Sequence, residues 1–85
     1  MRSDLVSALP LVLYAQQAMP IPSQITAQIR QLIAEQVLSP GDHIPSTRAL
    51  AKQLGVSRGS VVTAYDQLAA EGYIVTAHEI GRAHV

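Results

Sequence analysis

The chain has 85 residues, enough for one small domain, and 48% of them are hydrophobic, which supports a packed core and argues against wholesale disorder. Without cysteine it can have neither a disulfide framework nor a thiolate metal site, and a reducing cytoplasmic location is expected. The formal net charge is zero, so any binding to nucleic acid has to depend on a local patch of charge.

The first segment, residues 1–21, is expected to be an apolar arm. Its run from Leu5 to Ala15, LVSALPLVLYA, weakly resembles a signal peptide. However, Asp4 interrupts the basic start, Pro10 breaks the run, and eleven residues are too few to cross a bilayer. We therefore expect an arm that packs on the domain or on a partner, and no association with a membrane.

Residues 22–85 are expected to form a three-helix core with a β-hairpin, and the first helix is predicted to begin at Pro22 or Ser23. Apolar residues recur at three- and four-residue steps with polar residues such as Thr26 between them, which indicates an amphipathic helix of about 15 residues. The apolar set comprises Ile25, Ile29, Leu32, Ile33 and Val37. The sequence of residues 39–42, SPGD, then predicts a turn.

Two more helices with serine N-caps are predicted next. Ser46 would cap the second helix, and Gly55 is the residue type that favours the left-handed conformation found at helix ends. The apolar side of this helix would comprise Ala49, Leu50 and Leu54. Ser57 would cap the third helix, which Gly72 would close. Its inward-facing residues would be Val61, Ala64, Tyr65 and Leu68, which leaves Gly59, Val62, Thr63 and Asp66 facing outward.

The end of the chain predicts a hairpin. Residues 73–76, YIVT, are rich in β-forming types and indicate a strand. Residues 78–81 are expected to turn, and residues 82–85 would form the returning strand. The fold class is therefore mainly α with a small β-hairpin.

The stretch GVSRG at residues 55–59 also satisfies G-x-S-x-G, the pattern of the serine hydrolase nucleophile elbow. Such an elbow requires a buried strand before its serine, whereas the preceding ALAKQL has apolar residues at helical spacing. Asp66 follows Ser57 by nine residues along the same predicted helix, a rise of about 13 Å that separates the two side chains. The pattern therefore favours a capping serine, and no enzyme is expected.

A helix, a four-residue turn at residues 54–57 and a second helix are the parts of a helix-turn-helix, with Val56 filling the space between the helices. Residues 45–64 include Arg48, Lys52 and Arg58 and no acidic residue. This local excess of positive charge is sufficient to dock on phosphate. The hairpin that follows would serve as a wing.

The run PGDHIPSTRALAKQLGVSRGSVVTAYDQLAAEGYIV resembles the winged helix-turn-helix domain of the GntR family of bacterial transcription regulators. The resemblance covers about residues 23–85, and its most specific parts are PSTRAL, GVSR, YDQL and EGY. The stretch VTAY at residues 62–65 is most similar to the MocR branch, in which this domain precedes a large aminotransferase-like domain that binds pyridoxal 5′-phosphate. The resemblance thus implies the N-terminal domain of a longer regulator, with no cofactor bound by this chain itself.

The resemblance and the basic patch together predict sequence-specific binding of double-stranded DNA. The third helix, from about Arg58 to Glu71, would enter the major groove, and the residues nearest the bases would be Arg58, Gly59, Val62 and Thr63. Contacts to phosphate, which fix the register, would come from Ser46, Thr47, Arg48, Lys52, Ser57 and Ser60. The wing would contact DNA through His78 or Arg82. The family implies a homodimer on an operator with paired half-sites.

Several of these residues have a second interpretation. Arg48 could pair with Asp42, Lys52 could be an ordinary surface residue, and Val62 could lie at the edge of the core. For Ser46 and Ser57, a role as helix N-caps would be sufficient, without any contact to phosphate. For the whole chain, the main alternative is a winged helix that binds protein and no DNA, which the zero net charge and the apolar arm would suit.

The wing differs from the family pattern, because residues 77–85 lack the glycine-rich G-x-G-T tip. The chain also has histidines at positions 43, 78 and 84, but no acidic or histidine partner stands at helical ligand spacing. Positions in loops or in the wing are the simpler interpretation of these histidines, and no metal is expected.

Overall fold

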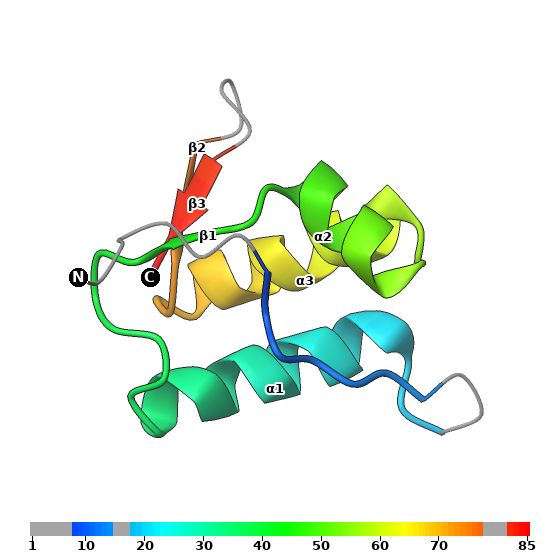
Figure 1. Ribbon diagram of the computed structural model, residues 1–85, viewed down its shortest axis with the longest axis horizontal. Coiled ribbons are helices and arrows are strands. Elements are labelled where there is room, and N and C mark those ends of the chain that lie inside the picture. Colours follow the sequence, from blue (N-terminus) through cyan, green and yellow to red (C-terminus); the bar gives the residue numbers. More distant parts are fainter. Residues whose placement is uncertain (1–7, 15–17, 78–81) are drawn as a thin grey trace.

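The computed structural model describes residues 8–14, 18–77 and 82–85 (Figure 1). Its helices are α1 (Ile21–Ala34), α2 (Thr47–Leu54) and α3 (Arg58–Ala70), and its strands are β1 (His43–Ile44), β2 (Val75–Ala77) and β3 (Arg82–His84). Helix α3 lies between the other two helices and packs extensively against both (Figure 1). This is the winged helix-turn-helix architecture that the sequence predicts.

The sheet has one strand more than the predicted hairpin. Its order is β1-β3-β2, and both pairings are antiparallel. In the central strand, His84 lies opposite His43 on one side and Val75 on the other. Strand β1 was not predicted because two residues are too few to show the alternation that identifies a strand. Strand β2 begins at Val75 rather than at Tyr73.

Helix α1 begins at Ile21, close to the predicted start. Pro22 fits in its first turn, because the first N–H groups of a helix have no partner within the helix. The helix ends at Ala34, and Gln36 then takes a left-handed conformation with φ 61°. Val37 was predicted to be on the apolar face, but it follows this turn and is 53% exposed. Leu38 is buried in its place.

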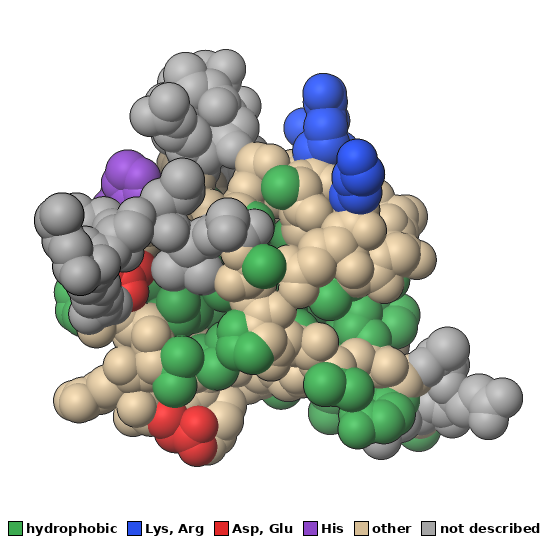
Figure 2. Space-filling model, in the orientation of Figure 1, with side chains coloured by type: hydrophobic (Ala, Val, Ile, Leu, Met, Phe, Trp, Pro, Cys, Tyr) green, Lys and Arg blue, Asp and Glu red, His purple; other side chains and the backbone are tan. Residues whose placement is uncertain are grey.

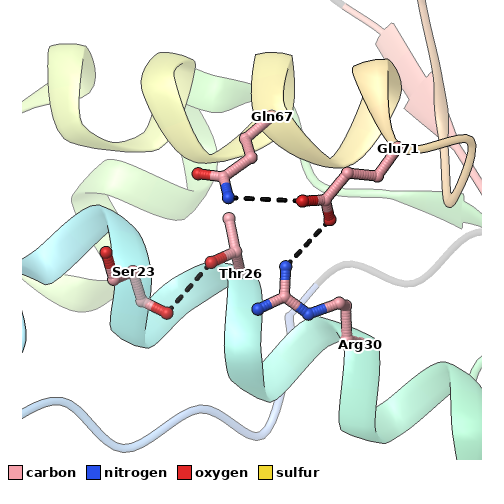
Figure 3. A network of polar contacts seen from close by, with 5 residues as sticks. All are labelled: Ser23, Thr26, Arg30, Gln67 and Glu71. Carbon is pink, nitrogen blue, oxygen red and sulfur yellow. Dashed lines mark hydrogen bonds and ion pairs between the residues drawn. The ribbon is translucent and has the colours of Figure 1, made fainter.

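Thr26 was predicted to be on the polar side of α1, yet it is buried. Its Oγ1 donates a hydrogen bond of 3.0 Å to the carbonyl oxygen of Ser23 one turn earlier (Figure 3). This bond satisfies the hydroxyl, so the threonine can be buried without leaving a polar group unpaired.

The predicted orientation of α3 is confirmed. Its buried side chains are Val61, Ala64, Tyr65 and Leu68, while Gly59, Thr63 and Asp66 are exposed and Val62 is half-buried. The Tyr65 hydroxyl donates a 2.7 Å hydrogen bond to the carbonyl oxygen of Pro45. Burial raises the pKa of Tyr65 well above its usual value, so this hydroxyl stays protonated and continues to act as a donor.

In α2 the predicted apolar side is right in part. Leu50 is buried and Leu54 is half-buried, but Ala49 is exposed and Ala51 is buried instead. Ala51 stands three residues before Leu54 and so shares its side of the helix, whereas Ala49 is turned away.

A polar contact joins α1 to the end of α3 (Figure 3). Arg30 Nη1 lies 2.9 Å from Glu71 Oε1, and Gln67 Nε2 donates to the other carboxylate oxygen of Glu71 at 3.4 Å. Both charged side chains are partly exposed, so this ion pair contributes little to stability.

Substitution of Leu68 tests the orientation of α3. Because Leu68 is completely buried, Leu68→Ala should lower the free energy of unfolding by about 2–5 kcal/mol, through lost burial and a residual cavity. Thr63→Ala, on the exposed side of the same helix, should change it by less than about 0.5 kcal/mol. Urea denaturation of both variants measures the difference, and equal stabilities would show that the burial pattern is wrong.

Candidate nucleic-acid interface

Two serine N-caps and one glycine define both ends of α2 and the start of α3. Ser46 Oγ accepts a hydrogen bond from Ala49 N at 3.1 Å, and Ser57 Oγ accepts one from Ser60 N at 3.2 Å. Gly55 has φ 68° and ψ 33°, a left-handed conformation in which glycine is not strained. The sequence predicted all three features. The element that leads into Ser57 is a helix, so GVSRG is a capping turn and lacks the strand that a nucleophile elbow requires.

The first residues of α2 and α3 lie side by side. Arg58, the first residue of α3, is exposed, and its Nε donates a 3.2 Å hydrogen bond to Oγ1 of Thr47, the first residue of α2. The sequence analysis did not predict this contact, because the two residues are eleven positions apart and belong to different helices. The bond leaves the two terminal guanidinium nitrogens of Arg58 without a further hydrogen bond in the described part of the chain.

The other two basic residues of the predicted patch stand on α2. Arg48 and Lys52 are exposed, and neither makes a hydrogen bond or ion pair within residues 8–14, 18–77 and 82–85. Asp42, the alternative partner considered for Arg48, is buried, and its Oδ2 accepts a 2.9 Å hydrogen bond from Ser39 N. The fold therefore gathers three basic side chains on the surface formed by α2 and the start of α3.

Figure 2 shows how this charge is distributed over the surface. Blue side chains of lysine and arginine gather at the end of the molecule where α2 lies, and on this face the red carboxylates lie away from them, at the left and at the lower edge near α1. Strands β2 and β3 lie in the same upper part of Figure 1 as α2. A neutral molecule thus has a positively charged end.

Of the remaining predicted site residues, those on α3 are described by the structure and those of the wing are not. Gly59 and Thr63 are exposed on α3 beyond Arg58, Val62 is half-buried between them, and Ser60 Oγ lies 2.9 Å from Ser57 Oγ. The predicted wing residues are not placed. His78 lies outside the described residues, as does the side chain of Arg82, although the backbone of Arg82 belongs to β3.

The two described histidines, His43 and His84, face each other across β1 and β3 with ring centroids 5.9 Å apart. Among the described residues, no group of three or more histidine, cysteine or acidic side chains is placed to hold a metal ion. No helix in this part of the chain combines the length and the apolar character needed to cross a membrane.

The family model described as bacterial regulatory proteins, gntR family, matches residues 22–83. The pyridoxine biosynthesis transcriptional regulator PdxR of Corynebacterium glutamicum is 56% identical over 77 residues, which cover 91% of this chain and 17% of that protein. The probable rhizopine catabolism regulatory protein MocR of Rhizobium meliloti is 41% identical over 64 residues, 75% of this chain and 13% of that protein. The chain therefore spans less than a fifth of the length of these curated relatives.

A solved structure, YtrA from Sulfolobus acidocaldarius, a GntR-family transcription factor, superimposes with a TM-score of 0.82 at 41% identity. The superposition covers 88% of this chain and 78% of YtrA. The match to PdxR also includes residues of the arm. Residues 22–85 number only 64, so at least 13 of its 77 aligned residues precede residue 22.

Substitution of Ser57 tests its role as the N-cap of α3. Ser57→Ala removes the acceptor for Ser60 N and should destabilise the domain by roughly 1 kcal/mol, whereas Ser57→Asp restores an N-cap acceptor and should recover most of that loss. Thermal denaturation of the two variants measures this. The interpretation of Ser57 as a cap is contradicted if both variants melt at the wild-type temperature.

Proposed function

Because the chain belongs to the gntR family of bacterial regulatory proteins, we propose that it is the sequence-specific DNA-binding domain of a transcription regulator. The observation that carries the proposal is the position of Arg58. It stands exposed at the start of α3, next to Thr47, and on the same surface as the basic side chains of α2. A helix that begins in this way offers a base-reading side chain and free backbone N–H groups to the same duplex.

Helix α3 is proposed to lie in the major groove. Its 13 residues give a length of about 20 Å, and the groove is wide enough to admit a helix. Arg58 would use its two terminal nitrogens on the acceptor edge of a guanine. Gly59 and Thr63 would approach the bases beside it, while half-buried Val62 would offer only its outer methyl group to a thymine methyl. Asp66, exposed farther along α3, would repel phosphate and so limit the contact to the first turns.

The surrounding polar residues are proposed to bind phosphates and to fix the register of α3. Arg48 and Lys52 would each neutralise a phosphate, because both are exposed on α2. Hydroxyl groups and helix N-termini would supply neutral contacts, through Ser46, Thr47, Ser57 and Ser60. The wing would add a contact from His78 or Arg82 to the DNA backbone or the minor groove.

For the full-length regulator we propose a homodimer on an operator with paired half-sites, and a cytoplasmic location. Pyridoxal 5′-phosphate would bind to a separate aminotransferase-like domain. The described residues do not fit this cofactor, since the chain has one lysine, Lys52, and that side chain is exposed on the proposed DNA surface rather than enclosed. The proposal for this chain is thus a non-enzymatic DNA-binding module.

Substitution of Arg58 tests the base contact. A duplex selected by the wild-type chain from a random library provides the ligand. Arg58→Ala should weaken binding to that duplex by about 1–3 kcal/mol and reduce discrimination at one base pair, because a bidentate contact to guanine is lost. Fluorescence anisotropy with the selected duplex and its single-base variants measures both effects.

Arg30→Ala is the matched control, because Arg30 pairs with Glu71 between α1 and α3 and lies outside the basic patch. It should keep the wild-type affinity for DNA. The melting temperatures of both variants should stay within a few degrees of wild type, since neither arginine is buried. Equal DNA affinity of Arg58→Ala and wild type would contradict the proposed role of α3.

The dependence on salt tests the phosphate contacts. Wild-type binding should weaken steeply with salt, with a slope of log K against log salt of roughly −3 to −5, for about four to six phosphate contacts. Lys52→Gln should make the slope less negative by about 0.9 without changing which duplex is preferred. A wild-type slope near zero would contradict the proposed phosphate contacts, whereas failure to bind any duplex at low salt would favour a winged helix that binds protein and no DNA.

A further inference from the structure

Residues 8–14 of the arm form an extended segment whose buried apolar side chains pack on the helices. Leu9 is only 2% exposed and belongs to the hydrophobic core, and Leu11 and Leu13 are half-buried against it. Val12 and Tyr14 are 57% and 55% exposed. Burial that alternates with a period of two is typical of an extended chain lying on a packed surface. In Figure 1 this dark blue segment passes in front of α1.

Three glutamine side chains hold the backbone of this segment. Each uses its amide oxygen to accept from the N–H, and its amide nitrogen to donate to the carbonyl, of a single arm residue. The distances from the backbone N to Oε1 and from Nε2 to the backbone O are 3.2 and 2.7 Å for Gln53 with Leu9. They are 3.0 and 2.6 Å for Gln28 with Val12, and 2.8 and 2.9 Å for Gln24 with Tyr14. These paired bonds reproduce what a neighbouring strand would supply in a sheet, so they depend on the arm's backbone and not on its side chains.

The three glutamines come from two different helices. Gln24 and Gln28 belong to α1, whereas Gln53 is in the last turn of α2, two residues before Gly55. The extensive helix contacts of α2 are with α3, and α2 has only eight residues, a length at which a helix depends on its neighbours for stability. The arm therefore provides a second attachment for α2, on the side towards α1.

We propose that the arm is a strap that holds α2 in place for DNA binding, and that Leu9 and Gln53 are positioning residues. The inference rests on the proposed function, because Thr47, Arg48 and Lys52 stand on the helix that the strap fixes. A displacement of α2 would move its phosphate-binding side chains. It would also break the 3.2 Å hydrogen bond from Arg58 Nε to Thr47 Oγ1. The family model begins at residue 22, so the strap lies outside the residues that it matches.

The alignment with PdxR supports a shared role for this segment, since it extends at least 13 residues before residue 22. Buried Gln24 gives further support. It is 4% exposed, and its Nε2 also donates to the carbonyl oxygen of Met19 at 2.8 Å. The side chain thus joins Tyr14 to Met19 within the arm, and both of its amide N–H donors are used in holding the chain in this path.

The first variant removes the hydrogen bonds of one glutamine without altering the core. Gln53→Leu keeps the size of an exposed side chain but loses both hydrogen bonds to Leu9. Gln31→Leu is the matched control, because exposed Gln31 donates to Glu35 one turn later and makes no hydrogen bond to the described residues of the arm. Leu9→Ala provides a second variant that weakens the same attachment through its buried end.

Two measurements are made on each variant: affinity for the duplex selected by the wild-type chain, and hydrogen exchange of backbone amides. Gln53→Leu should weaken DNA binding by about tenfold and reduce amide protection in α2, while protection in α1 and α3 is retained. Leu9→Ala should show the same selective loss in α2, and Gln31→Leu should match wild type in both measurements.

The outcomes distinguish the strap from the proposed function. Wild-type affinity and unchanged α2 protection in Gln53→Leu would overturn the strap while leaving DNA binding intact. Reduced affinity with uniform loss of protection in all three helices would also overturn it, since that pattern reports general destabilisation. Failure of the wild-type chain to bind any duplex at low salt would overturn the proposed function itself, and with it the role of the strap in DNA binding.

Discussion

Helix α3 is buried along one side by α1 and α2, and its contacts determine what the rest of the molecule can do. Val61, Ala64, Tyr65 and Leu68 are each at most 1% exposed, so the helix cannot rotate about its axis without losing its packing. The Tyr65 hydroxyl adds a buried hydrogen bond to Pro45, immediately before the cap of α2. The packing therefore fixes both the outward side of α3 and the position from which α2 begins.

Function follows from what this constraint leaves exposed. Because the orientation of α3 is fixed, the Arg58 side chain is exposed at the start of this helix. There its Nε donates a hydrogen bond to Thr47 Oγ1. Arg48 and Lys52 are brought to the same end because α2 packs on α3. A chain of zero net charge thus obtains a basic surface through the arrangement of three side chains, and the overall charge gives no sign of it.

The sequence was most informative where a local rule decides the structure. Helix phase predicted the buried side of α3, and the preferences of serine and glycine at helix ends predicted the caps of α2 and α3 and the turn at residues 54–57. The errors arose where helix phase was overridden by another local feature or where a distant contact decides. Thr26 is buried because its hydroxyl bonds within α1, Val37 is exposed because Gln36 ends the helix early, and strand β1 exists only through its pairing with β3.

The candidate site, like the fold, could be predicted from the sequence only in part. The sequence could identify Arg48, Lys52 and Arg58 as a cluster, because acidic residues are missing between positions 45 and 64. It could not predict the contact between Thr47 and Arg58 or the attachment of Gln53 to Leu9, which is 44 residues away along the chain. Such contacts form only in the folded chain. No sequence pattern distinguishes a helical glutamine that bonds to the backbone of another segment from an ordinary surface glutamine.

The central claim is that α3 and the start of α2 form the surface that meets DNA. Backbone amide shifts recorded by NMR, with and without a duplex selected by the wild-type chain, test it most directly. The account predicts the largest changes at residues 46–52 and 57–63, and small changes along α1 at residues 27–34. The largest changes along α1 or the arm, with residues 57–63 unaffected, would contradict it.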